Sequence, residues 1–395
     1  MQMLVAADAR TAASRFGFKS AVFILVLAAI LFLAATSHAI TLAIVTERVA
    51  GGSSGYLNHE IRLTGSFERG DSDQLKNMLE DLKGRGGTKP GESLALLSFD
   101  SKGGALEEGM RVGRLLRQFA VATIVRSGRR CLSSCAIAFL GGSTLGPAGP
   151  QADRQLEVGG RLGFHAFYAP RDGDAHDAAT SRARGVTEGR ATSALVVAYV
   201  LEMGIAPGPI LRALVRPPEE MTYIETAGEF VDLGICPVAL KLPRATLPQR
   251  ASNICSNASE GHLPVWPDLV NEYTPLEAQR LLLGEIAFHA AQANVRAGIA
   301  ARLQQVLRGG RGVEALYAEL AATGLPLPVM RGKAFYFEIP VPGIRRMGCL
   351  ATLTHDDPAR YGVVLITQDG LARPTQPAPS ECPELFLFGH DEVVN

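Results

Sequence analysis

The sequence predicts an α/β protein in which a domain of alternating strands and helices precedes a helical segment and a small antiparallel β-sheet. Three observations lead to this prediction. Short apolar runs alternate with helical patterns between about residues 60 and 170, which is typical of parallel βαβ units with right-handed crossovers. An Ala, Leu and Arg pattern of helical period covers 276–307. After Lys333, strand-like runs recur between turn residues.

The first half of the chain divides into elements in a regular order. Asp71 has Gln74 three residues on, the spacing of a helix start. The expected strands are 60–65, 93–99, 121–125 and 161–165. The expected helices are 71–83, 106–119, 187–203 and 207–215, the third with an apolar face of Ala194, Val197 and Leu201.

The remaining segments have weaker patterns. Residues 171–185 are polar and aperiodic, which predicts an exposed loop, and 243–267 predict an irregular linker. The long helix is expected to break near Ala297, and a short helix is expected at 313–322. Antiparallel strands are expected at 335–341, 349–354, 363–367 and 385–388.

The composition indicates a folded chain. Hydrophobic residues make up 47% of the 395 residues, charged residues make up 20%, and the formal net charge is zero. These values allow a sizeable core and exclude global disorder. A balanced charge gives no reason to expect nucleic acid as a partner.

The N-terminus carries an export segment with two alternative interpretations. Basic residues precede an apolar run at 21–35, and a second apolar run covers 40–45. The segment is either a signal peptide or a membrane anchor made of both runs, because the first is shorter than the roughly 20 residues that span a bilayer. Both interpretations place the remainder on the extracytoplasmic, for example periplasmic, side.

These patterns define five regions. Their predicted boundaries are 1–45 for the signal peptide or anchor, 46–58 for a Gly/Ser-rich tether, 59–240 for the α/β domain, 241–330 for a linker and helical segment, and 331–395 for the antiparallel β domain.

Six cysteines in an exported chain permit disulfides. Proximity in the sequence suggests that Cys236 pairs with Cys255 and Cys349 with Cys382. Cys131 and Cys135 either form a local bridge or are both buried as small hydrophobic residues. No Cys and His cluster has zinc-ligand spacing, so neither a metal nor a cofactor is expected.

The segment CLSSCAIAFLGG at 131–142 is the candidate catalytic centre. It follows an apolar strand and begins a helix, so a hydroxyl there lies beside free backbone N–H groups. Ser133 is the candidate nucleophile, which needs a base and donors for an oxyanion. Gly103 and Gly104 follow one strand and His165 ends another, and sites in α/β sheets form where such strand ends converge.

Four segments, in this order, resemble the proteolytic subunit of Clp protease and the wider Clp/crotonase-like superfamily. They are SKGGALEEGM at 101–110, SSCA at 133–136 with Phe139 and Gly142, LGFH at 162–165, and DLGI at 232–235. The resemblance covers about 60–238 and is greatest to an exported branch of that superfamily. It implies a spiral of ββα units and hydrolysis by a Ser–His pair. By it, Ser133 is the nucleophile, His165 the base, and the N–H groups of Gly104 and Ser134 the oxyanion hole.

Two features depart from the family pattern. The family orients its histidine with an Asp, yet no Asp occurs from Ala178 to Val231. Glu219 and Glu220 lie near the expected place. Lys102 stands where a proline is usual, and it is the lysine that a Ser–Lys dyad would use.

Structural roles are open alternatives for each of these residues. Ser133 can be a simple helix N-cap, Ser134 can be the functional hydroxyl, and His165 can be a core histidine between two phenylalanines. We therefore expect an exported or membrane-tethered serine hydrolase that acts on peptide or protein substrates. The alternative is a non-catalytic binding or scaffold protein that keeps the fold, and assembly into a homo-oligomer is left open.

Overall fold

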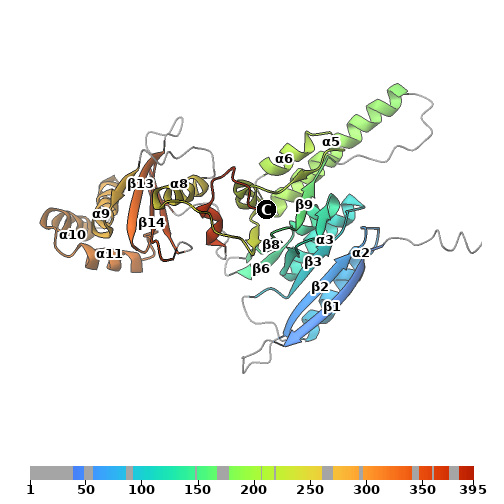
Figure 1. Cartoon of the computed structure of the whole chain (residues 1–395), viewed down its shortest axis with the longest axis horizontal. Helices are drawn as coiled ribbons and strands as arrows, with labels where there is room; N and C mark the ends of the chain where they lie inside the picture. Colours follow the sequence, from blue (N-terminus) through green and yellow to red (C-terminus); the bar gives the residue numbers. More distant parts are fainter. Residues whose placement is uncertain are drawn as a thin grey trace, which may run out of the picture. The chain divides into compact units, whose positions relative to one another are not determined.

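The computed structural model describes residues 39–48, 57–85, 92–146, 149–166, 178–205, 207–217, 219–259, 270–292, 297–339, 347–357, 360–372 and 382–395 (Figure 1). These residues form a mixed α/β structure with a mixed sheet, flanking helices and a separate antiparallel sheet. The part from Ile40 to Asn395 is one compact unit by its contacts.

The main sheet has six strands in the order β1-β2-β3-β4-β8-β11. Parallel pairing joins β2 to β3, β3 to β4, β4 to β8 and β8 to β11, as the alternating pattern predicts. The strands are β1 (Thr41–Arg48), β2 (Leu57–Thr64), β3 (Ala95–Asp100), β4 (Val121–Val125), β8 (Arg154–Glu157) and β11 (Cys236–Val238). The helices α2 (Asp71–Arg85) and α3 (Leu106–Phe119) connect β2, β3 and β4, and their buried apolar residues share one core with these strands.

The strand β1 occupies the second apolar run that the predicted membrane anchor required. Residues 41–48 pair antiparallel with β2 along their whole length, so the second apolar run is a strand of the sheet. The anchor needed both runs, and the prediction of a transmembrane helix is therefore wrong. Among the described residues, no helix has the length and apolar character to cross a membrane. The first run and the rest of the predicted signal peptide lie outside the described residues.

A second sheet has three strands in the order β10-β9-β5. A parallel bridge between Ser101, which follows β3, and Cys131 of β5 places this sheet at the end of β3. Its strands are β5 (Arg130–Leu132), β9 (Arg161–Phe164) and β10 (Thr222–Tyr223), and β6 (Ser143–Gly146) and β7 (Gly149–Ala152) form a separate hairpin. The helices here are α4 (Ser134–Phe139), α5 (Ala178–Glu202), α6 (Gly208–Leu214) and α7 (Ala227–Leu233).

Helix α5 differs from its prediction in two respects. It begins at Ala178, so the predicted exposed loop is wrong for 178–185, while 171–177 lie outside the described residues. Its buried face contains Val196, Tyr199 and Val200, whereas Leu201 is 58% exposed. The sequence pattern failed here because a mostly apolar helix offers more than one apolar stripe.

The third sheet has five antiparallel strands in the order β12-β13-β14-β15-β16. The strands are β12 (Asn271–Tyr273), β13 (Lys333–Ile339), β14 (Met347–Leu353), β15 (Gly362–Thr367) and β16 (Gly370–Ala372). In β13 the alternation is plain: Ala334 and Tyr336 belong to the core with α9, α10 and α11, and Phe335 and Phe337 to the core with α8. The helices are α8 (Leu247–Ala258), α9 (Pro275–Gln292), α10 (Ala297–Gly309) and α11 (Val313–Ala322), which flank β13 and β14 in Figure 1.

Two predictions in this part of the chain are wrong. The expected linker at 243–267 contains α8, whose first turn is capped by the Thr246 hydroxyl accepting from the Gln249 N–H. The expected strand at 385–388 is a 3₁₀ helix, η2 (Pro383–Leu387), whose buried Leu385, Phe386 and Leu387 gave the apolar run. Short apolar runs do not distinguish a strand from a buried helical turn.

The disulfide pairing suggested by proximity is also wrong. Cys236 is bonded to Cys382, and Cys255 to Cys349, across 146 and 94 residues. The first bond joins β11 to the start of η2, and the second joins α8 to β14. Cys131 and Cys135 form a local bridge, so each of the six cysteines is bonded.

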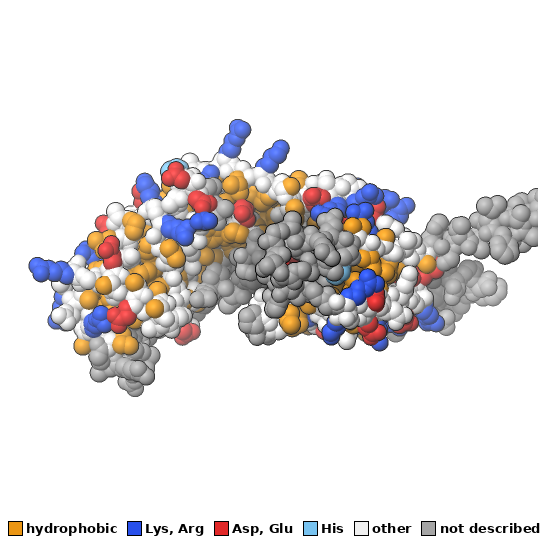
Figure 2. All heavy atoms as spheres, turned by 90° about the horizontal axis from the view of Figure 1, so that it is seen from below, with side chains coloured by type: hydrophobic (Ala, Val, Ile, Leu, Met, Phe, Trp, Pro, Cys, Tyr) orange, Lys and Arg blue, Asp and Glu red, His pale blue; other side chains and the backbone are white. Residues whose placement is uncertain are grey.

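Acidic and basic side chains are interspersed over the face that Figure 2 presents, in agreement with the zero net charge. No charged surface of one sign covers that face.

A buried arginine joins the main sheet to two helices. Arg154 of β8 is 3% exposed, and its guanidinium donates to the carbonyl oxygens of Leu233 (2.7 Å) and Met203 (3.2 Å). Leu233 ends α7 and Met203 follows α5, so the positive charge lies at the negative ends of two helices. Desolvation lowers the Arg154 pKa to about 10, which leaves the group charged at neutral pH.

Replacement of Arg154 by Met should destabilise the fold. The change leaves the Leu233 carbonyl without a donor and the Met203 carbonyl with only the 3.3 Å bond from Arg117, and we expect the free energy of unfolding to fall by about 2 kcal/mol. Arg62→Met is the control, because Arg62 is exposed and its ion pair with Glu60 is worth at most about 1 kcal/mol. Urea unfolding of both variants with intact disulfides measures the difference, and equal losses would contradict this role of Arg154.

Candidate functional site

Ser133 occupies a strained turn between β5 and α4. Its φ of 60° and ψ of −126° are rare for a residue with a side chain, and such conformations cost on the order of 1–3 kcal/mol. The Ser133 N–H donates to the Gly163 carbonyl (2.9 Å), and its own carbonyl accepts from Ile137 N–H (3.2 Å). Its side chain is half-buried, so the hydroxyl is presented at the surface rather than used as an ordinary helix cap.

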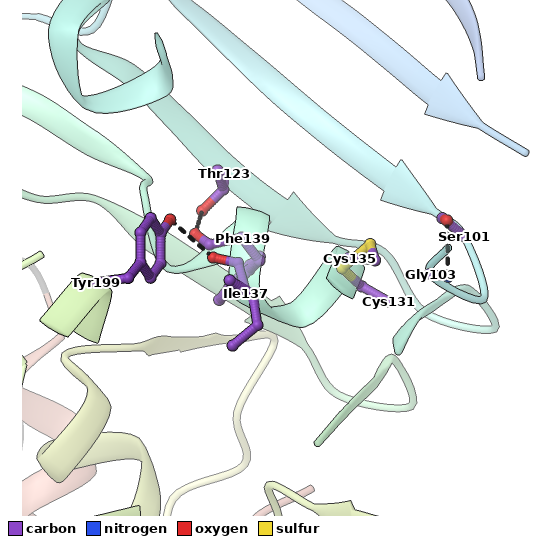
Figure 3. Close-up of a disulfide and its surroundings, with 8 residues drawn as sticks. All are labelled: Ser101, Gly103, Thr123, Cys131, Cys135, Ile137, Phe139 and Tyr199. Carbon is purple, nitrogen blue, oxygen red and sulfur yellow. Dashed lines mark hydrogen bonds between the residues drawn. A yellow bond between two sulfur atoms is a disulfide. The ribbon is translucent and has the colours of Figure 1, made fainter. Parts of the chain in front are cut away.

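A disulfide encloses this turn. Cys131 lies in β5 and Cys135 in the first turn of α4, and their bond joins the two ends of the turn that holds Ser133 (Figure 3). Both cysteines have no exposed surface. The bridge therefore limits how far the strand end and the helix start can separate, which opposes relaxation of the strained residue.

The far end of α4 is held by two side chains. The Tyr199 hydroxyl donates to the Ile137 carbonyl (2.9 Å) and the Thr123 hydroxyl to the Phe139 carbonyl (3.1 Å) (Figure 3). These carbonyls are among those that a helix leaves unpaired at its C-terminus. Burial raises the Tyr199 pKa, so its hydroxyl keeps the proton that it donates.

The glycine turn after β3 lies against Ser133. A Cβ atom built on Gly103 would be 2.8 Å from Ser133 Cβ and 3.2 Å from Ser134 N. Gly103 has φ of 100° and Gly104 has φ of 143°, conformations that favour glycine. An alanine at either position would collide with the neighbouring chain, which gives a physical reason for two glycines here.

Two backbone N–H groups are available beside Ser133. Phe67 donates to the Gly103 carbonyl (2.9 Å) and accepts from Ala105 (2.9 Å), so the N–H of Gly104 between them points away from Phe67. The Ser134 N–H is the first of α4. Within the described part of the chain, neither the Gly104 nor the Ser134 N–H donates a hydrogen bond. An oxyanion hole requires such unpaired donors; Gly104 is exposed, whereas Ser134 has no exposed surface.

Ser134 is unsuited to be the functional hydroxyl. Its side chain is 0% exposed, and a Cβ atom built on Gly109 of α3 would be 3.0 Å from its Cβ. The Ser134 Oγ is buried without a hydrogen-bond partner in the described structure. A substrate cannot reach it, so the alternative assignment of the nucleophile to Ser134 is not supported.

His165 follows the strand that pairs with β5. Leu132 is in register with Gly163, which brings the ends of β5 and β9 side by side. The half-buried imidazole has Nδ1 2.7 Å from the Ala166 carbonyl, and because a carbonyl only accepts, Nδ1 carries the proton. Nε2 is then the basic nitrogen. No hydrogen bond joins the Ser133 and His165 side chains in the residues described, and such bonds are often long without substrate.

The predicted third residues lie beside His165 without bonding to it. Continuing the register of β10 with β9 by two residues places Glu220 opposite Ala166. Glu219 and Glu220 are exposed, and Glu220 pairs with Arg216 at 3.8 Å. Neither carboxylate forms a hydrogen bond with His165 in the described structure, and the described partner of Nδ1 is the Ala166 carbonyl. Lys102 is exposed on the glycine turn.

Sequence reasoning missed the groups that hold the site. Tyr199, Thr123 and the Ala166 carbonyl have no motif that could have identified them. Met221 was also missed: its Sδ would lie 2.9 Å from a Cβ atom built on Gly163, so its side chain covers that glycine. The sequence did not indicate that the two-residue strand β10 pairs with β9, and this pairing brings Met221 to the site.

Other features of the chain do not add to this site. No group of His, Cys, Asp or Glu side chains in the described residues could hold a metal ion. A cavity of about 590 Å³ is lined by residues of β8, β11 and η2, and Ser133 is not among them. No protein-family model and no curated protein matches this chain.

Loss of the Cys131–Cys135 bridge should loosen the turn and α4. We expect Cys131→Ala/Cys135→Ala to lower the free energy of unfolding by about 2 kcal/mol, since the closed loop is short. Amide hydrogen exchange should rise most at Ile137 to Leu140. The control Cys255→Ala/Cys349→Ala should raise exchange in α8 and β14 instead. Unchanged exchange in α4 would show that the bridge does not hold the turn.

Proposed function

We propose that this chain is a serine hydrolase of the Clp/crotonase-like type that cleaves peptide bonds outside the cytoplasm. The observation that carries the proposal is the strained Ser133 backbone at a strand–helix turn, with an accessible hydroxyl and free N–H groups beside it. Strain of this kind persists where the surrounding structure enforces it, and it gathers at active sites.

In the proposed reaction, His165 Nε2 takes the Ser133 proton as the oxygen attacks the peptide carbonyl. The N–H groups of Gly104 and Ser134 stabilise the oxyanion, and the imidazolium protonates the leaving amine. Water, deprotonated by the same imidazole, then attacks the acyl-enzyme and releases the acid. The Ala166 carbonyl holds Nδ1–H, and therefore the ring, in the tautomer that this cycle needs.

Two further observations support the proposal. Strand, strand and helix follow one another through β4, β5 and α4, as expected for a ββα unit, whereas α2 separates β2 from β3. The three disulfides favour an oxidising compartment, in keeping with an exported chain.

A fluorophosphonate probe, which reacts with activated serines, tests the nucleophile. We expect wild type to be labelled and Ser133→Ala not to be labelled. Ser134→Ala should keep its labelling, as should Ser127→Ala, which removes an exposed serine of the β4–β5 loop. A binding or scaffold protein would show no labelling of wild type, and equal labelling of wild type and Ser133→Ala would exclude Ser133.

The identity of the base is tested by comparing His165 with Lys102. His165→Gln should slow labelling by about 10²–10⁴-fold, because a general base contributes that much. Lys102→Met should leave the rate within about threefold of wild type, because Lys102 is exposed and is not the proposed general base. The reverse pattern would assign the chemistry to a Ser–Lys dyad. Circular dichroism spectra of both variants control for folding.

A further inference from the structure

Two arginines stand side by side on the sheet that carries Ser133. Arg130 of β5 is in register with Arg161 of β9, and the strands are parallel neighbours. Both arginine side chains are exposed, and the residue that follows each in its strand, Cys131 or Leu162, is buried. The two arginines therefore share the outer face of the sheet. Like charges in register destabilise a sheet, so this pair needs a reason.

The described residues do not neutralise the pair. Arg126 and Arg129 in the preceding loop have partners, Glu60 at 3.3 Å and Asp100 at 2.8 Å. Neither Arg130 nor Arg161 forms an ion pair in the part of the chain that the structure describes. Arg161 is nevertheless held in place, because its guanidinium lies 4.1 Å from the centre of the Tyr223 ring of β10.

The outer face continues from the arginines to the end of β5, which Ser133 follows in the chain. Leu132 and Met221 are half-buried and meet over Gly163, where a built Cβ atom would be 3.1 Å from Leu132 and 2.9 Å from Met221. They form an apolar pad between the arginines and the end of the strands. Ser133 is three residues beyond Arg130, about 10 Å along a strand.

We propose that Arg130 and Arg161 form a carboxylate-binding subsite that selects peptide substrates with an acidic side chain two or three residues from the scissile bond. Two guanidinium groups, one of them fixed by Tyr223, provide the planar donors that a carboxylate accepts. The pad of Leu132 and Met221 takes an apolar side chain nearer the bond. This inference rests on the proposed hydrolase function and names its substrate class.

Peptide binding to Ser133→Ala tests the subsite without turnover. The probes are decapeptides of Gly and Ser with a central Leu, a fluorescein label and an amidated C-terminus. In one series a Glu lies two or three residues from the Leu, and in the matched series a Gln takes its place. Fluorescence anisotropy should show that the best Glu peptide binds about tenfold more tightly than its Gln partner. The ratio should fall to about one when Arg130→Gln and Arg161→Gln are added.

The matched control adds Arg126→Gln and Arg129→Gln instead, which removes the same charge from two neighbouring arginines and should keep the preference. Equal binding of Glu and Gln peptides, or a preference that survives Arg130→Gln/Arg161→Gln, would overturn the subsite. So would a Gln peptide with a free C-terminal carboxylate that binds as tightly as the Glu peptide. Failure of the hydrolase proposal is distinct, because it appears as unlabelled wild type with the fluorophosphonate probe.

Discussion

The backbone of Ser133 adopts a conformation that a residue with a side chain avoids, and much of the surrounding structure opposes its relaxation. On one side, the N–H of Ser133 is bonded to β9 and Cys131 is bonded to Cys135. On the other, Tyr199 and Thr123 hold the carbonyls of a helix too short to be stable alone. Gly103 leaves room for the turn. These contacts come from four separate segments, so the turn is a product of the tertiary fold.

The pairing of β5 with β9 sets the rest of the site. One register brings His165 to the level of the nucleophile, Arg161 beside Arg130, and Gly163 beneath the pad of Leu132 and Met221. A shift of one residue would exchange the inner and outer faces of these strands. Chemistry and substrate choice would then be lost together, because both depend on the same few hydrogen bonds.

Much of the fold was readable from local pattern. The helix 106–119 and the strand 121–125 were predicted at their observed bounds, because the apolar pattern changes from helical spacing to a continuous run there. Ser133, His165 and the glycine turn were found by their places at strand ends. What escaped prediction depends on distant contacts: the α5 face that buries Tyr199, the short β5 and β10 strands, the helix α8 and the pairing of the later cysteines. The contact of the His165 Nδ1 with the Ala166 carbonyl was not predicted either.

The nested disulfides have a consequence for how the chain matures. Cys236 and Cys255 are separated by few residues and are synthesised well before Cys349 and Cys382, so loop closure favours their mutual oxidation first. That early bond is non-native, and it must be exchanged through mixed disulfides before β11 and η2 can be joined. A chain that has formed this bond therefore reaches the native pairing only by thiol–disulfide exchange, which an isomerase or a redox buffer supplies and an oxidant alone does not.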